Sequence, residues 1–410
     1  MRAPRRLRGF SMVELMVAMM IALIAVIIMF QVFETSEGVR RTTASGGDAQ
    51  QNGTIALYTL QRDLRNAGMG INDTTYAGCP LKGYDSARTT PAFPPVGVTM
   101  VLSPALITPG ANAQTPDQLA VFYGSKGQIG NSTTLTANMV DATSPLQVFS
   151  RFGFRPGDLV LMLEPGSGKD CIFVEITSLD AAITNQVNHD SGAYTLSAGA
   201  SVNSRFNPVG GLTTGVGAGT YGGVNTANVT RVYNLGNLYD DINFPGSQNV
   251  TVPVYDVYAV ANNTLTVANQ FVIATSGAGS GAPVVSSVAD NIVHMRVDYG
   301  LDDGSNDPSV PYNTVHVAND GIVDKFTSAA PNWSQVIAIR VAVVARSALP
   351  EKPTAGAGAP CDTTTAAPSW SGDTGGARSF DLSADANWQC YRYQVFETTV
   401  PLRNWIWKSF

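Results

Sequence analysis

The stretch FSMVELMVAMMIALIAVIIMF, from Phe10 to Phe30, decides the fold of this chain because it holds 21 residues and a single charge, at Glu14. At 1.5 Å rise per residue it forms a helix about 30 Å long, which is the thickness of a bilayer core. Four arginines precede it: Arg2, Arg5, Arg6 and Arg8. Such a cluster stays on the cytoplasmic side, so we expect a single-pass protein with its N-terminus in and its C-terminus out.

The residues after the apolar run indicate that this helix is retained. An ordinary secretory signal ends in small residues at a cleavage site, whereas residues 31–34 read QVFE. A carboxylate within the span costs roughly 2 to 3 kcal/mol, so Glu14 requires a cationic partner. Two simpler interpretations are a plain anchor whose Glu14 reaches the membrane interface and a signal peptide cleaved further along.

The start of the chain, RLRGFSMVEL, resembles the type III signal of type IV prepilins. The resemblance implies a basic leader at residues 1–9, cleavage by a prepilin peptidase after Gly9, and methylation of the new N-terminal residue, Phe10. It also implies that Glu14 meets the terminal amine of a neighbouring subunit during assembly. Losing the leader would change the formal charge from −6 to −10, which argues against a nucleic-acid partner.

Residues 31–70 predict an amphipathic helix that continues beyond the transmembrane helix of residues 10–30. Its apolar stripe consists of Ile55, Leu57, Leu60, Leu64 and Ala67. Three charged residues are expected off the stripe: Arg62, Asp63 and Arg65. Gly68 and Gly70 predict its end. Three earlier glycines predict a bent or broken rod: Gly38, Gly46 and Gly47.

The rest of the chain, residues 71–410, predicts a β-rich globular domain. Only 14% of all residues are charged, and β-branched runs alternate with turn residues. The predicted strands are residues 118–123, 158–164, 171–177, 251–261 and 270–275. Asn262 and Asn263 predict a hairpin turn. Glycine-rich stretches predict flexible loops near residues 207–227 and 353–377. The predicted class is α+β, with a long N-terminal helix packed on antiparallel sheet.

Five stretches resemble minor pilins of the PilW type: residues 50–70, 154–177, 289–300, 336–347 and 393–405. The first, QQNGTIALYTLQRDLRNAGMG, is similar to a family pattern in which an asparagine-glycine pair precedes a helix ending in R-D-L-R-x-A-G. The last, YQVFETTVPLRNW, resembles the closing strand of the family. The resemblance implies a subunit without an active site of its own that helps to start pilus assembly and supports twitching motility or adhesion.

The same resemblance implies the partners and the location. The partners would be other minor and major pilins, the prepilin peptidase, the inner-membrane assembly platform and a tip adhesin of the PilY family. The protein would lie in a bacterial inner membrane and then in a pilus or at the cell surface. A pseudopilin of a type II secretion system and a membrane-anchored periplasmic binding domain that never polymerises are the alternatives.

The four cysteines, Cys79, Cys171, Cys361 and Cys390, predict disulfides in an exported chain. No two of them have the close spacing of zinc ligands. Spacing alone leaves three connectivities open. The resemblance to pilins, in which a disulfide closes a C-terminal loop, favours Cys361 with Cys390 and therefore Cys79 with Cys171.

Catalytic and cofactor-binding patterns do not assemble in this sequence. His189, His294 and His316 lack the spacing of metal ligands. The segment EPGSGKD differs from a phosphate-binding loop because Leu163 replaces a glycine and Asp170 replaces the Ser or Thr after the lysine. We therefore expect no enzyme activity and no bound cofactor.

Acidic turns are the remaining candidates for a metal site. Asp302, Asp303 and Asp307 carry the oxygen ligands that calcium prefers, and a second acidic turn follows at residues 319–324. Neither turn has the EF-hand spacing. Solvated turns between strands are the simpler interpretation, with calcium as a secondary hypothesis.

Overall fold

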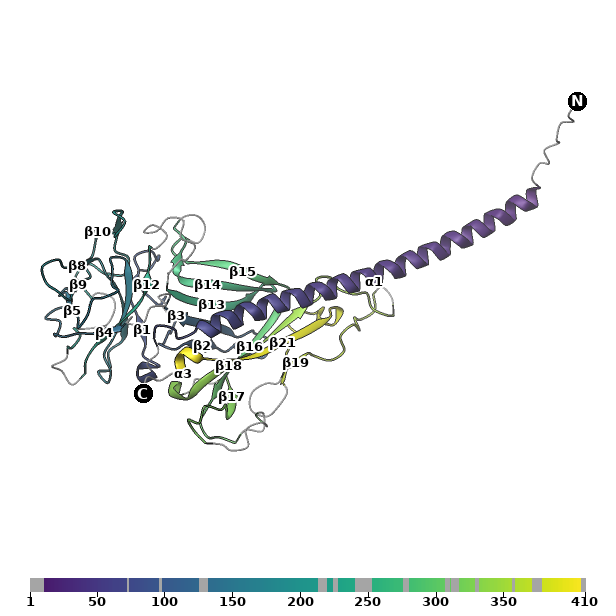
Figure 1. Ribbon diagram of the computed structural model, residues 1–410. Coiled ribbons are helices and arrows are strands. Elements are labelled where there is room, and N and C mark those ends of the chain that lie inside the picture. The colour runs from purple at the N-terminus through teal and green to yellow at the C-terminus, as the bar shows by residue number, and fades with distance from the viewer. Residues whose placement is uncertain are drawn as a thin grey trace, which may run out of the picture.

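A computed structural model gives a long helix attached to a β-rich body (Figure 1). It describes residues 11–71, 74–95, 98–124, 132–212, 220–223, 228–239, 253–275, 280–306, 310, 317–328, 332–355, 358–370 and 378–406. The antiparallel sheets and the single long helix confirm the predicted α+β class.

Helix α1 runs unbroken from Met12 to Asn66 and curves gently as it leaves the body (Figure 1). The prediction of a broken rod at Gly38, Gly46 and Gly47 is wrong. Each glycine in a helix costs roughly 1 kcal/mol relative to alanine but removes no backbone hydrogen bond. Three glycines in so long a helix therefore need not break it. The helix does end before Gly68, whose φ of 77° is the left-handed conformation expected of a helix stop.

Two antiparallel sheets pack against one face of the C-terminal half of α1 (Figure 1). The first has the order β15 (Pro283–Asp290), β14 (Thr264–Ile273), β13 (Val254–Ala261), β3 (Gln118–Tyr123) and β2 (Ala105–Thr108). The second has the order β17 (Lys325–Thr327), β16 (Ile292–Leu301), β18 (Val336–Arg346) and β21 (Tyr393–Pro401). A short helix, α3 (Arg403–Ile406), follows β21.

A second group of strands, the distal strands, forms the distal part of the body, which is the end away from the helix N-terminus (Figure 1). Its main sheet has the order β1 (Leu81–Lys82), β7 (Cys171–Glu175), β6 (Asp158–Leu163), β12 (Arg231–Asn237) and β4 (Ser132–Thr134). Small sheets join β5 (Leu146–Gln147), β9 (Gln186–Asn188) and β8 (Ser178–Leu179), and β10 (Ala193–Thr195) with β11 (Ser201–Asn203). β19 (Ser369–Trp370) pairs with β20 (Arg378–Ser379), and Trp370 packs against Ala342 and Val344 of β18. The 3-10 turns are η1 (Thr74–Tyr76), η2 (Trp333–Gln335) and η3 (Trp388–Cys390).

The predicted runs agree with described strands, except that β14 spans Thr264–Ile273 whereas the predicted run was 270–275. β3 has the predicted bounds, and β6 and β7 begin at the predicted residues. Asn262 and Asn263 join β13 to β14 with φ of 51° and 59°, which is the hairpin turn that the asparagine pair predicted. β3, β6 and β7 were recognisable because their apolar runs are continuous and both of their faces are buried.

Parts of the two glycine-rich stretches lie outside the described residues. Within the described parts, Leu212 and Tyr221 are buried in the core of the distal strands, and Trp370 is buried against β18. The segments around residues 207–212 and 220–223 therefore carry packed side chains as well as the glycines.

Both disulfides join the pairs that the pilin resemblance implied. Cys79 bonds to Cys171, which ties the segment after α1 to β7, and Cys361 bonds to Cys390. The second bond fixes the segment after β18 beside η3, where the backbone N–H of Glu351 donates to the carbonyl of Cys390 at 2.7 Å. Each bond therefore anchors a segment that has little regular structure.

Candidate functional site

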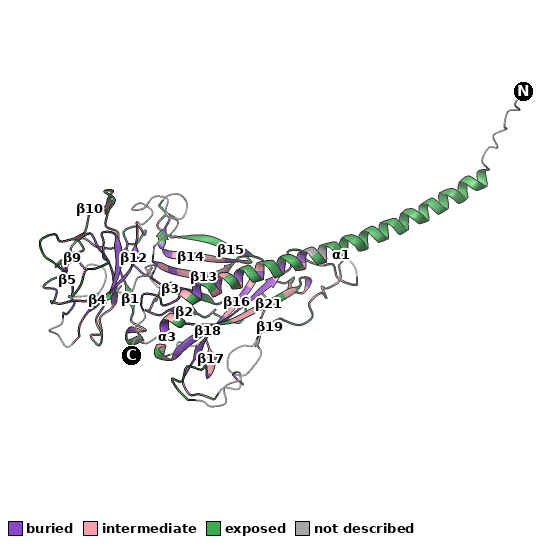
Figure 2. Cartoon of the chain, in the orientation of Figure 1, coloured by how far each residue is buried: buried purple, intermediate pink, exposed green. Residues whose placement is uncertain are grey.

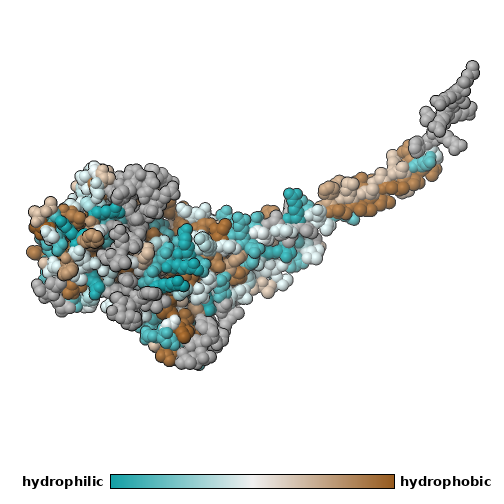
Figure 3. All heavy atoms as spheres, in the orientation of Figure 1, coloured by the Kyte–Doolittle hydropathy of each residue, from teal (hydrophilic) through white to brown (hydrophobic). Residues whose placement is uncertain are grey.

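The projecting half of α1 is the first part of the candidate site. Met12–Gly38 is long and apolar enough to cross a membrane, and none of it is buried within the chain. Apolar side chains cover its surface in Figure 3, and Figure 2 shows the same segment as exposed. So large an apolar surface requires a partner outside the chain, either lipid or other helices.

Glu14 lies in the first turn of this half. Ser11 is the N-cap, and its hydroxyl accepts the N–H of Val13 at 3.3 Å, while the Glu14 carboxylate accepts the N–H of Ser11 at 3.1 Å. This capping box satisfies two backbone donors and fixes the carboxylate at the helix start. Gly9 and Phe10 lie outside the described residues, so cleavage and methylation there stay predictions.

The other half of α1 attaches to the body through a narrow face of small and aliphatic residues. The buried residues on this face are Ala49, Ala56, Leu60, Leu64 and Ala67, with Gly53 between them. Ile55, which the predicted stripe included, is 40% exposed and lies off this face. Leu60, Leu64 and Ala67 are buried as predicted, and Leu57 packs against the same core. Ile55 was assigned wrongly because the neighbouring small residues, Gly53 and Ala56, carry a weak apolar signal.

Asp63 is also buried on this face, at 2% exposure, so the prediction that it lies off the apolar stripe is wrong. The hydroxyl of Tyr258 on β13 donates a hydrogen bond to its carboxylate, and the Nε of Arg62 lies 3.0 Å from the same group. Burial, followed by the negative charge of Asp63, raises the pKa of nearby Asp256 to about 6. Sequence periodicity could not reveal this polar contact, because its partner lies 195 positions away.

The C-terminal segment closes the end of α1. The side-chain amide of Asn404 donates to the carbonyl of Arg65 at 3.0 Å, and thereby satisfies one of the last carbonyls of the helix. Trp405 is 1% exposed and donates its indole N–H to the carbonyl of Trp333 at 3.3 Å. The end of the chain therefore holds the end of the helix in the core.

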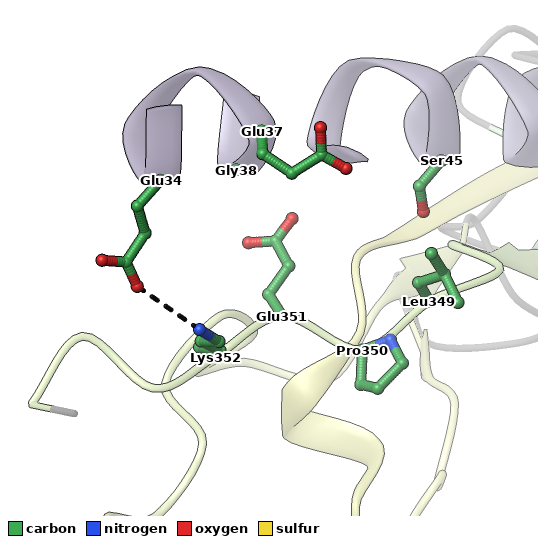
Figure 4. A pocket seen from close by; sticks show the side chains of 8 residues that line it. All are labelled: Glu34, Glu37, Gly38, Ser45, Leu349, Pro350, Glu351 and Lys352. Carbon is green, nitrogen blue, oxygen red and sulfur yellow. Dashed lines mark ion pairs between the residues drawn. The ribbon is translucent and has the colours of Figure 1, made fainter. Parts of the chain in front are cut away.

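A cleft of about 420 Å³ lies where α1 leaves the body (Figure 4). Its lining consists of Glu34, Glu37, Gly38, Ser45, Leu349, Pro350, Glu351 and Lys352. Lys352 pairs with Glu34 at 3.5 Å, and Arg392 binds both oxygens of Glu351. Since the Lys352–Glu34 pair is largely exposed, it contributes little stability. The cleft is therefore a lightly held junction between the helix and the segment anchored by the second disulfide.

The histidines of the described chain are separated and serve the fold. His189 lies 2.9 Å from the carbonyl of Ser144, and burial lowers its pKa. His294 lies on β16, where burial and then the charge of Arg296 lower its pKa to about 4. His316 lies outside the described residues. Neither described histidine therefore has the exposed, paired setting of a catalytic base.

The lysine of the EPGSGKD turn is likewise engaged in structural contacts. The Nζ of Lys169 lies 2.8 Å from the Glu164 carboxylate and 2.6 Å from the carbonyl of Thr220. These contacts hold the turn against the segment at residues 220–223.

The acidic turns bind their own backbone. The carboxylate of Asp302 accepts N–H groups from Asn319, Asp320 and Gly321, and Asp303 pairs with Lys325 at 2.5 Å. Asp307 lies outside the described residues. Among the described residues, no group of three or more His, Cys, Asp or Glu side chains could hold a metal ion. The described carboxylates therefore organise the turn itself.

Comparison with known families places these features in a recognised class. Residues 4–30 match the model for the prokaryotic N-terminal methylation motif, and residues 257–404 match the model for type IV pilus-assembly protein W, PilW. No curated protein and no solved structure matched the chain. The second match begins within β13 and ends at Asn404, so it covers much of the two sheets that pack against α1.

The exposed apolar helix with its methylation motif defines a type IV pilin-like protein. Within that class, the match over the C-terminal sheets shows that residues 257–404 are similar to type IV pilus-assembly protein W, the PilW family. That family consists of structural components of pili, which interact with other pilus components. The similar stretches at residues 50–70 and 154–177 lie outside both matched ranges.

Proposed function

We propose that this protein is a minor pilin that is cut after Gly9 by a prepilin peptidase, methylated on Phe10, and built with other minor pilins into a complex that starts pilus assembly. The observation that supports this most directly is the unbroken helix whose N-terminal half is entirely exposed and whose C-terminal half is built into the core. Such a helix presents an apolar surface to neighbours while the body stays outside the membrane.

Glu14 would select those neighbours. Cleavage creates an amine at Phe10, and a carboxylate in an apolar surrounding is stabilised by an opposite charge from an adjacent subunit. On this proposal Glu14 exchanges its contact with the Ser11 N–H for the amine of a neighbour, which sets the register between helices. The protein carries no active site of its own and acts as a substrate of the peptidase.

The proposed topology follows from the arginines of the leader: N-terminus in the cytoplasm, body in the periplasm, and later a position in the pilus or at the cell surface. The proposed partners are major and minor pilins, the inner-membrane assembly platform and a tip adhesin of the PilY family. Twitching motility or adhesion would follow from an assembled pilus.

The test is N-terminal mass spectrometry of the chain from cells with and without prepilin peptidase, for wild type and Gly9→Val. We expect a chain that begins at methylated Phe10 only when both the peptidase and Gly9 are present. Retention of Met1 in every sample would show a membrane-anchored protein that is never processed. Loss of enzyme secretion with intact pili in a deletion strain would instead identify a pseudopilin of a type II secretion system.

A second measurement isolates the role of Glu14. Glu14→Gln should be processed normally but should be reduced at least tenfold in sheared surface filaments, because the amide carries no charge. Glu34→Gln is the matched control, since Glu34 is a 79% exposed carboxylate on the same helix, beyond the apolar run that ends at Phe30. Equal incorporation of both variants would contradict the proposed pairing.

A further inference from the structure

The free edges of the sheets differ in length and in protection. At the described sheet ends, β1, β2, β4 and β17 are at most four residues long, whereas β15 has eight residues and β21 has nine. β21 carries the charged Glu397 and contacts α1 through Phe396. β15 is therefore the long edge strand with the least protection in the described part of the chain.

β15 has few of the features that normally prevent strand pairing, although two register shifts interrupt its pairing with β14. Its sequence, PVVSSVAD, carries no charge before Asp290, and charged side chains or short length are the usual protections of an edge. Val284 and Val285 are 43% and 64% exposed, and Ser286 and Ser287 are also exposed. Figure 2 shows β15 as exposed along much of its length. Its protective residues are Pro283 at the start and Asp290 at the end, so the residues between them carry no such protection.

The chemistry of this edge determines what can bind there. β15 pairs with β14 on one side only, from Thr264↔Asp290 to Ala268↔Val285 and, after a register shift, at Ile273↔Pro283. In the part that ends at Val285, alternate residues therefore direct their N–H and C=O groups away from the sheet. A row of alternating donors and acceptors beside exposed valines is matched by another extended strand with apolar side chains.

A second copy of this chain does not fit as that strand. A twofold-symmetric pair of β15 edges would be antiparallel, and β15 lies alongside α1 (Figure 1). Such a pair would direct the two apolar helices in opposite directions, whereas copies anchored in one membrane must direct them the same way. The other end of β15 packs on α1 through Ala289, so a strand added at this edge would lie beside the assembling helix.

We propose that residues 283–287 of β15 form a strand-addition site for an extended segment of a different pilus subunit. The proposal rests on the proposed function, because it requires neighbours anchored in the same membrane. The added strand continues the sheet β15-β14-β13-β3-β2 by one strand and covers Val285.

The test places the photoreactive residue p-benzoylphenylalanine at position 285 of the full-length chain, in cells that contain the complete pilus machinery. We expect a covalent adduct with a different pilus subunit, with the joined peptide mapping to a segment that alternates apolar and polar residues. Position 140 is the control, because Val140 is 89% exposed and lies on the distal part. Val285→Lys should lower co-purification of that subunit at least tenfold, and Val140→Lys should leave it unchanged.

Three outcomes would overturn the inference: an adduct of two copies of this chain, no adduct at position 285 above the level at position 140, or full co-purification with Val285→Lys. Intact disulfides and an unchanged thermal midpoint establish that the variants fold. The mass of the N-terminus is measured in the same samples. A processed chain without the edge adduct rejects only the strand-addition site, whereas an unprocessed chain rejects the proposed function and the site together.

Discussion

The ring of Phe396 on β21 lies so close to Gly53 of α1 that a β-carbon at position 53 would be 2.0 Å from a ring carbon. Only glycine permits this approach of the helix to the strand. The contact explains in physical terms why a glycine, Gly53, occurs inside this long helix.

Gly53→Ala should therefore destabilise the protein, although alanine favours helices in general. Overpacking costs typically 1 to 3 kcal/mol, and we expect a loss of about that size. Gly38→Ala is the control because open space surrounds Gly38, and it should gain up to about 1 kcal/mol. Urea unfolding of the full chain in detergent, followed by tryptophan fluorescence, measures both. Equal effects of the two variants would exclude the packing explanation.

Tyr258→Phe should weaken the attachment of α1. The substitution keeps the ring but leaves the Asp63 carboxylate buried without its hydroxyl donor, which costs roughly 1 to 3 kcal/mol. Tyr58→Phe is the matched control, since Tyr58 lies on α1, as Asp63 does, and is 65% exposed. The unfolding free energy should fall only for Tyr258→Phe, and an unchanged value would show that the hydrogen bond contributes nothing.

Asp256 should make stability depend on pH. Its pKa rises from 3.8 to about 6, because of burial first and then the charge of Asp63, so the folded state favours the protonated form. The contribution of protonated Asp256 to the free energy of unfolding is complete below pH 4 and is lost as the pH rises through 6. It amounts to at most about 3 kcal/mol.

Asp256→Asn should remove this loss, so its stability relative to wild type should increase between pH 4 and pH 7. The free energy of unfolding, measured across this range for both proteins, tests the sign of this change. Titrations that the two proteins share, such as that of His294, cancel in the difference between them. Asp141→Asn is the control, because hydrogen bonds from Thr143 lower the pKa of exposed Asp141 and its effect has the opposite direction. A constant difference between wild type and Asp256→Asn would contradict the assignment.

The two disulfides should contribute unequally. Loop entropy predicts about 4.5 kcal/mol for Cys79–Cys171, which closes 92 positions, and about 3.5 kcal/mol for Cys361–Cys390, which closes 29. Paired serine substitutions for each bond, compared by thermal unfolding, give the two values. Removing the second bond should also increase proteolysis near Glu351, since its anchor at Cys390 is lost. Intact protease resistance there would show that the ion pair of Arg392 with Glu351 is sufficient.

Local patterns in the sequence predicted much of this structure. The exposed apolar helix follows from one apolar run, the β13 to β14 hairpin from two asparagines, and the helix end from Gly68. Each of these depends on neighbours in the sequence.

The attachment face was less predictable because it depends on distant residues. Asp63 was expected off the apolar stripe, yet it is buried because Tyr258 offers a donor inside the core. The buried residue on the face is Ala56 and not Ile55, because a sheet lies close to the helix there. Similarly, nothing near β15 in the sequence indicates that it is an edge strand, since edges are a property of sheet order.

The continuity of α1 also has a mechanical consequence. A pull on the exposed half, from Met12 to Gly38, passes without a flexible joint into the buried half. The load then acts as shear along the face from Ala49 to Ala67, where many side chains resist it at once rather than one after another. Tension in a filament would thus be carried by the core around α1, and the strands around β6 and β12 would remain outside the path of the force.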